Sequence, residues 1–297
     1  MILAMPSPFG SKFHLPILSL DANWYQVVAT YRELVRLQAQ LSDEAARYKN
    51  EIHALLVVLF PEFTQVFVDP SRPTALALLK LYPSPQAIVA AGVQRVASKL
   101  HELSPHHYGR QTAERLVGLA QQSVSSGLAI SARSTSLRIL CDQLEHTQAN
   151  LAQLEEEIDK LLSTDPKAKG LCSVPEFGPK TVAVLRAELG DVNRFHRRDQ
   201  VVAYAGLDIE VKESGKWKGK AMLSKRGSGR LRRTLYMAAV RCVRLEGSPF
   251  GAYYHRLVAR GMKKVMALVA VMRKMLVVAT HLVKTEEMYD PTKVSSL

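Results

Sequence analysis

Two stretches of the chain repeat apolar residues at spacings of three and four, which is the pattern of an amphipathic helix. The first starts at Asp21, keeps one apolar face through residues 24–59 and ends at Pro61. The second, over residues 137–161, is a heptad seam that never slips and has one polar member, Thr147. We expect this seam to be buried against another helix. That partner is either the first long helix, in an antiparallel hairpin, or a helix of a second chain.

Between these two helices, prolines divide the pattern into shorter elements. Five prolines fall within residues 61–87 and surround a short helical piece at residues 74–81. Residues 63–68 look like a strand, whereas residues 85–103 and 112–119 have helical spacing. The pattern therefore predicts a cap or hinge of short elements at the end of the first long helix.

The C-terminal part of the chain begins with a tight turn that contains Pro175 and Gly178 and opens a helix ending near Leu189. Pro179 suits the first position of that helix, and Gly190 suits its end. Together with a preceding helix, these residues predict a helix-hairpin-helix, whose second helix can meet a phosphate with its N-terminus. An ordinary corner between two helices fits the same residues equally well.

A small β element is predicted around Ser214, because residues 209–211 alternate as a half-buried strand and run into a Ser-Gly turn. Helices with wide apolar faces are expected at residues 234–245 and 265–282. On the last helix we expect three core methionines and two solvent-facing cations: Met266, Met272 and Met275, and Arg273 and Lys274. The predicted fold class is mainly α, with a long coiled-coil helical region followed by a helical domain that contains a helix-hairpin-helix and the β element.

Charge separates the chain into two parts. Residues 1–165 hold 14 Lys and Arg against 16 Asp and Glu, whereas residues 166–297 hold 26 against 11, so the net charge of +13 belongs to the C-terminal part. We predict an irregular lead-in over residues 1–20, a helical and coiled-coil region over residues 21–165 and a C-terminal domain over residues 166–297. A basic domain attached to a neutral framework is typical of nucleic-acid binding.

The basic residues concentrate within residues 212–233, where nine stand against one acid, Glu213. So many cations repel one another unless an anion accompanies them, and we therefore interpret the run as a surface for a phosphate backbone. Ser224 and Ser228 either touch phosphate or cap the helix near Arg230. The candidate nucleic-acid contacts are Gly178, Lys180, Lys212, Lys216, Lys218, Lys220, Ser224, Lys225, Arg226, Arg230, Arg232 and Arg233.

Cysteine usage and hydropathy place the protein in a reducing compartment without a membrane partner. Cys141, Cys172 and Cys242 lie far apart in the sequence and are interpreted as buried thiols. No segment has the length expected of a transmembrane helix. His106 and His107 have no Cys or acid at a fitting spacing, so no metal site is predicted.

A series of short motifs follows in fixed order over about the last 125 residues, and such a series is more specific than any one motif. The motifs are Pro175-x-x-Gly178, Glu188-Leu189-Gly190-Asp191, Arg194-Phe195, Ala203-Tyr204-Ala205-Gly206-Leu207, Glu213-Ser214-Gly215, Ser224-Lys225-x-Gly227, Leu231-Arg232-Arg233, Lys263-Lys264-Val265 and Tyr289-Asp290-Pro291. The series resembles the C-terminal transposase domain of a bacterial insertion-sequence family, IS110 with IS116 and IS902. Two positions depart from the family pattern: Glu176 replaces a glycine and would face the phosphate, and Ile209 replaces a proline.

The resemblance implies both a reaction and an architecture. In that family a resolvase-like nuclease domain comes first, a coiled-coil region follows, and the C-terminal domain supplies a serine nucleophile. Ser214 occupies that Ser-Gly position, so the resemblance implies that Ser214 is the nucleophile. It also implies DNA as substrate, a structured guide RNA of the element, a homo-oligomer and a bacterial cytoplasmic location. Mg²⁺ is expected only with the nuclease domain, which we expect to be missing here, and no cofactor is expected in this chain.

The expected function is that of a transposase or site-specific DNA recombinase, which cleaves and rejoins strands through serine. Its metal would need several converging carboxylates. The acids at residues 155–157 are expected on a solvated helix face, and Asp69 alone cannot make a cluster. The alternative is a truncated, non-catalytic remnant that binds nucleic acid through a helix-hairpin-helix module.

Overall fold

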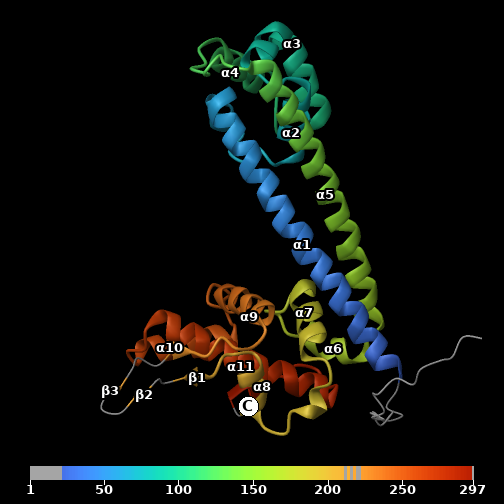
Figure 1. The fold of residues 1–297 in the computed structure, drawn as a ribbon, viewed down its shortest axis with the longest axis vertical. Coiled ribbons are helices and arrows are strands. Elements are labelled where there is room, and N and C mark those ends of the chain that lie inside the picture. The colour runs from blue at the N-terminus through green and yellow to red at the C-terminus, as the bar shows by residue number, and fades with distance from the viewer. Residues whose placement is uncertain (1–21, 211–212, 215–216, 219–221, 296–297) are drawn as a thin grey trace, which may run out of the picture.

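The computed structural model describes residues 22–210, 213–214, 217–218 and 222–295. Most of these residues are helical, so the predicted mainly α fold is confirmed. Two long helices, α1 (Ala22–Leu59) and α5 (Ile130–Thr164), form an antiparallel hairpin. The hairpin joins a cap of short helices at one end to a C-terminal helical domain at the other (Figure 1).

The heptad seam of α5 faces α1. Five of its positions are buried and three are half-buried: Leu137, Leu144, Thr147, Leu154 and Ile158, and Leu140, Leu151 and Leu161. Cys141 and Leu162, each one position beyond a half-buried seam residue, are buried as well. A straight helix with 3.6 residues per turn drifts away from a 3.5-residue repeat, which explains their burial. Of the two partners expected for the seam, the first long helix of the same chain is therefore the one that covers it.

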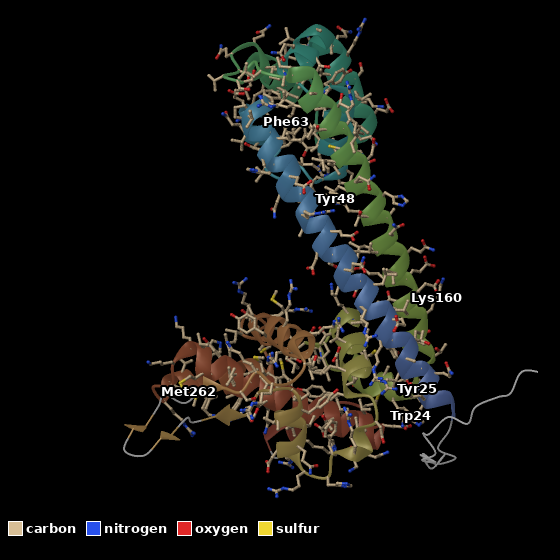
Figure 2. The ribbon with its side chains drawn as sticks, in the orientation of Figure 1. Trp24, Tyr25, Tyr48, Phe63, Lys160 and Met262 are labelled. Atoms are coloured by element: carbon tan, nitrogen blue, oxygen red, sulfur yellow. The ribbon has the colours of Figure 1, made fainter. Side chains whose placement is uncertain are left out.

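The cap consists of η1 (Pro61–Gln65), α2 (Pro73–Leu81), α3 (Pro85–Leu103) and α4 (Arg110–Gln121). The prediction of a strand at residues 63–68 is wrong, because a 3-10 helix begins at Pro61 and includes Phe63. Phe63 and Phe67 are four residues apart, so successive turns place them on one side, where their ring centroids stack 4.9 Å apart. Figure 2 shows Phe63 among the side chains at the far end of the hairpin.

The C-terminal domain packs its remaining helices around the last long one. In chain order its elements are α6 (Pro166–Cys172), α7 (Pro179–Leu189), η2 (Val192–Arg194), α8 (Arg198–Tyr204), β1 (Ile209–Glu210), β2 (Glu213–Ser214), β3 (Trp217–Lys218), β4 (Met222–Leu223), α9 (Gly229–Cys242), α10 (Pro249–Ala259), α11 (Lys264–Thr285) and η3 (Pro291–Ser295). Helix α11 contacts α6, α8, α9 and α10, and its apolar residues form the centre of the domain.

Helix α11 corrects several expectations. Met272 and Met275 are buried as predicted, but Met266 is exposed, because it lies in the first turn before the helix enters the core. Arg273 and Lys274 are half-buried rather than solvent-facing, since the chain after α8 covers that side and Arg273 Nε donates to its backbone. The expectation that no segment is long enough to span a membrane is also wrong. By length and composition α11 could do so, although its apolar side chains serve as the core of the domain.

Buried apolar residues form two separate clusters. One fills the cap and the adjoining part of the hairpin, from Ala45 to Leu144. The other fills the C-terminal domain and includes Tyr31 from α1 and Ile158 from α5. The base of the hairpin therefore belongs to the same hydrophobic core as the C-terminal domain.

A buried ion pair fixes the point where the hairpin enters that domain. Arg186 Nε of α7 lies 2.6 Å from Asp165 Oδ2, and the two side chains are 2% and 5% exposed. Asp165 also caps α6 by accepting from the Lys167 backbone N–H at 3.0 Å. The Arg186 guanidinium lies 5.9 Å from the Tyr31 ring centroid. These contacts tie α1, α6 and α7 together just below the hairpin.

The three cysteines are free thiols. Cys141 and Cys242 are buried as predicted, but the prediction is wrong for Cys172, which is exposed at the last position of α6. Its seven-residue helix turns this position outward, while Leu171 takes the inward one.

Candidate nucleic-acid interface and serine ribbon

The predicted β element is present as a ribbon between α8 and α9. Strands β1 and β4 pair antiparallel with Ile209 opposite Leu223, and β2 and β3 pair antiparallel with Ser214 opposite Trp217. Figure 1 shows the ribbon extending away from the helices of the domain. For Ser214 and Lys218 the description covers the backbone, whereas Lys212, Lys216 and Lys220 lie outside the described residues. Ser214 thus lies at the end of a paired strand.

The base of the ribbon is held by two close-packed glycines and two arginines. Gly206 has a φ of 65°, and a Cβ at Gly227 would lie 1.9 Å from the Tyr204 carbonyl oxygen, so the backbones approach more closely than any side chain permits. Arg232 Nη1 donates to the carbonyls of Ala205 at 3.0 Å and Gly227 at 2.8 Å. Arg273 Nε donates to the Leu207 carbonyl at 2.7 Å. The chain therefore enters and leaves the ribbon at a fixed position.

Two of the three candidate serines have defined partners. Ser224 Oγ donates to the Asp208 carboxylate, and the Ser224 N–H donates to the Asp208 carbonyl at 3.1 Å. Ser228 is the N-cap of α9, where its Oγ accepts from the Leu231 N–H at 3.1 Å. The capping role expected as one option for Ser228 is therefore the one found. Ser224 closes the ribbon base through Asp208, a residue that the sequence pattern did not single out.

The predicted cationic contacts divide into two groups. Arg230 and Arg232 are partly buried and point to protein groups: Arg230 Nη1 lies 2.9 Å from Glu188 Oε1, and Arg232 holds the ribbon base. Each therefore has a structural role through Nη1, and a phosphate contact of its other N–H groups stays a prediction. Lys225 and Arg226 are exposed beside the ribbon, and the Arg233 side chain is 80% exposed. Arg233 Nη1 also lies 3.9 Å from Asp43 Oδ1, a pair whose two side chains are largely exposed.

The turn between α6 and α7 is also less open than expected. Gly178 is the N-cap of α7, and its carbonyl accepts from the N–H groups of Thr181 at 2.8 Å and Val182 at 3.1 Å. Lys180 is exposed in the first turn. The sequence pattern did not identify Arg241, whose guanidinium lies close to Gly178. A Cβ atom built on this glycine would be 3.3 Å from Arg241 Nη1. Arg230 and Arg241 are about three helical turns apart on α9, and this spacing could have identified Arg241.

Glu176 does not face a phosphate, which corrects the expectation for this position. Its side chain is 1% exposed and accepts from Ser248 Oγ, which also caps α10 by accepting from the Gly251 N–H at 3.1 Å. Burial, together with the nearby Glu176, raises the pKa of Tyr289. The acid therefore links the α6–α7 turn to α10 instead of opposing a nucleic acid.

No group of three or more His, Cys, Asp and Glu side chains that could hold a metal ion is found among the described residues. The arrangement consists of a serine-bearing ribbon on a fixed base, with Lys225 and Arg226 exposed next to that base in the sequence, Arg233 exposed on α9 and Lys180 exposed on α7. Such a surface can bind phosphate groups and present a hydroxyl to one of them.

The class of protein is indicated by the part of the chain that holds this ribbon. Residues 168–255 match the family described as Transposase IS116/IS110/IS902. The resemblance predicted from the short motifs is thus confirmed, and these residues form a transposase domain of that family.

Curated relatives extend the similarity beyond this domain. The "Insertion element IS110 uncharacterized 43.6 kDa protein" of Streptomyces coelicolor is 26% identical over 270 residues, which cover 89% of this chain and 65% of the relative. The corresponding IS900 protein of Mycobacterium paratuberculosis is 27% identical over 75% of this chain and 55% of its own length. The pilin gene-inverting protein of Moraxella bovis is 26% identical over 50% of this chain and 48% of its own. The chain therefore spans no more than about two thirds of the length of these relatives.

Proposed function

We propose that this protein is a DNA transposase or site-specific recombinase of an insertion sequence, with Ser214 as its nucleophile. The observation that carries the proposal is the match of residues 168–255 to the transposase family. Relatives named for insertion elements and for pilin gene inversion support an action on DNA. The basic surface beside the ribbon supplies the electrostatic attraction that such a substrate requires.

The reaction that we propose is transesterification at a DNA phosphate. Ser214 Oγ attacks the phosphorus, the bond to the leaving sugar oxygen breaks, and the proton from Oγ ends on the released sugar hydroxyl. The phosphoserine ester keeps the phosphodiester energy, so the reverse attack by another sugar hydroxyl rejoins a strand without a nucleotide cofactor. We propose that Mg²⁺, held by carboxylates of a nuclease domain in a longer chain or a second polypeptide, stabilises the charge on the phosphate.

Contacts at the other two serines support the choice of Ser214. Ser228 already accepts a backbone N–H as a helix cap, so its oxygen has a structural role. Ser224 is the strongest competitor, because Asp208 could accept its proton, but the same contact closes the ribbon base. Ser214 lies farther along the ribbon, where a DNA strand can approach. A structured guide RNA and a homo-oligomer belong to the same proposal.

The test compares serine variants in a chain joined to the nuclease domain of a relative, with Mg²⁺, element RNA and donor DNA. We expect Ser214→Ala to abolish strand cleavage while DNA binding is retained, since the variant lacks the attacking oxygen. Ser228→Ala should lose on the order of 1 kcal/mol of stability from its cap and still cleave. Cleavage by Ser214→Ala at the rate of the parent would refute the assignment.

The alternative function is nucleic-acid binding without catalysis. It predicts that the parent chain binds DNA or RNA but forms no covalent link, even with the nuclease domain and Mg²⁺ supplied. The same assay therefore separates the two functions.

A further inference from the structure

A basic groove lies between the start of α8 and the C-terminal half of α11. Its volume is about 160 Å³, and its walls are Phe195, His196, Arg197, Arg198, Val201, Val277, Thr280, His281 and Lys284. None of these residues belongs to the basic run at residues 212–233. The walls contain three permanent cations and two histidines but no acid, which distinguishes the groove from an ordinary mixed-charge surface.

Positive charge continues past the groove along α11. Lys274 is half-buried, and its burial and then the charges of Arg198 and Arg256 lower the pKa of its ammonium group. The positively charged side chains of Arg198 on α8, Arg256 on α10 and Lys274 on α11 are thus close enough to repel one another. A phosphate placed among them would relieve this repulsion.

Two carboxylates lie near these cations. Asp199 Oδ2 pairs with Arg197 Nη2 at 2.7 Å on the exposed side of α8, and Glu287 Oε2 lies 3.9 Å from His281 Nε2 and 3.7 Å from Lys293 Nζ. In the part of the chain that the structure describes, five permanent cations lie in or beside the groove: Arg197, Arg198, Arg256, Lys274 and Lys284. These described cations outnumber the two carboxylates beside them.

The groove and the serine ribbon lie at opposite ends of α8. Helix α8 runs from Arg198, in the groove wall, to Tyr204, just before the ribbon base. Its seven residues span roughly 10 Å at about 1.5 Å per residue. Along one nucleic-acid strand this distance corresponds to roughly three phosphates.

We propose that the groove between α8 and α11 binds the phosphate backbone of a nucleic acid, as a second contact surface beside the ribbon. This inference rests on the proposed function and adds a surface that the basic run does not contain. The bound strand would pass the ribbon and reach the groove within roughly three nucleotides. Both duplex DNA and structured RNA carry the required phosphates.

The test measures binding of the full chain to a short DNA duplex and to an RNA hairpin across a salt series. The groove variant combines Arg198→Gln, Lys274→Gln and Lys284→Gln. The ribbon variant combines Lys225→Gln, Arg226→Gln and Arg233→Gln. A control removes the same number of exposed charges from the cap and hairpin by Arg95→Gln, Arg115→Gln and Lys160→Gln. Figure 2 shows Lys160 projecting outward from α5.

We expect the groove variant to bind at least one probe about tenfold more weakly at low salt, with a log–log salt slope smaller by about 2 to 3. The control should match the parent within about twofold. The probe that distinguishes the groove variant from the control identifies the nucleic acid that occupies the groove. A groove variant that behaves as the control overturns the inference, and it leaves the proposed function intact if the ribbon variant is weakened. If both variants match the control, DNA binding by the proposed surface fails as well.

A second measurement avoids multiple substitutions. Lys284 and Lys160 are both exposed, so an acylating reagent should modify both in the free protein. Addition of the bound probe should slow modification of Lys284 several-fold and leave Lys160 unchanged. Equal modification of Lys284 with and without the probe overturns the inference. Because this measurement uses the unsubstituted protein, it remains decisive if the triple variant does not fold.

Discussion

At the scale of single residues, the ion pair of Asp165 and Arg186 is expected to have a large effect on stability, because both side chains are buried. Replacement of one partner leaves the other charge buried without a counterion, which typically costs about 3 to 5 kcal/mol. We expect Arg186→Met to lower the free energy of unfolding by about this amount in a denaturant titration. Arg36→Met is the matched control, because its partner Glu33 lies at 3.1 Å but both side chains are largely exposed. The control should change stability by less than about 1 kcal/mol. Equal effects of the two substitutions would contradict the proposed role of the buried pair.

The cysteines give a chemical test of burial. Burial raises the pKa of Cys141 and of Cys242 to about 12, with smaller contributions from nearby carboxylates. A raised pKa leaves fewer thiolates at mildly alkaline pH, and the thiolate is the reactive form. We expect iodoacetamide to modify Cys172 first, since it is exposed although partial burial raises its pKa too. Peptide mass spectrometry at successive times checks the order, and equal rates at all three thiols would show that the two buried sites open freely.

Residue roles were the hardest feature to predict from the sequence. The sequence places Arg232 in a basic run, but its role depends on the carbonyls of Ala205 and Gly227, which are brought together by folding. Glu176 likewise looked like an acid beside a phosphate, yet Ser248, far away in the chain, determines its position. Charge patterns can identify a basic domain, but they cannot separate cations that face solvent from cations that satisfy backbone oxygens.

At the scale of elements, helical periodicity was a reliable predictor where it extended over many turns. The first long helix and the helix at residues 85–103 were predicted with nearly correct bounds, whereas α5 begins at Ile130, seven residues before the predicted seam. The periodicity failed over residues 63–68, because six residues do not distinguish a strand from a helical turn. It also placed Leu151 among the seam residues without indicating that it is only half-buried.

The seam can be tested with two leucine-sized residues on the same helix. Leu144 is 0% exposed in the core that the hairpin shares with the cap, whereas Ile139 is 55% exposed on the other side of α5. A charge at the buried position has no partner, so we expect Leu144→Asp to destabilise the protein by several kcal/mol. Ile139→Asp should change the unfolding midpoint little. If thermal melting followed by circular dichroism gives equal midpoints for both variants, the seam is not buried in solution.

At the scale of the whole molecule, the fold separates a nearly neutral part, the hairpin with its cap, from the basic C-terminal domain. Acids and bases nearly balance over residues 1–165, where the hairpin and cap are found, while the excess positive charge lies in the C-terminal domain. The serine ribbon extends from that domain, and its base is fixed because Arg232 of α9 and Arg273 of α11 donate to backbone carbonyls that follow α8. The cap has its own hydrophobic core, so its packing does not depend on side chains of the C-terminal domain.

The central claim is that Ser214 forms the covalent link to DNA, and peptide mapping of that link tests it most directly. The chain joined to a relative's nuclease domain is incubated with Mg²⁺, element RNA and a donor DNA whose rejoining is blocked, so that the phosphoserine ester accumulates. After protease and nuclease digestion, mass spectrometry locates the nucleotide remnant on one peptide. The account predicts a remnant on Ser214 and none on Ser224 or Ser228. A remnant on Ser224, whose hydroxyl donates to the Asp208 carboxylate, would contradict it.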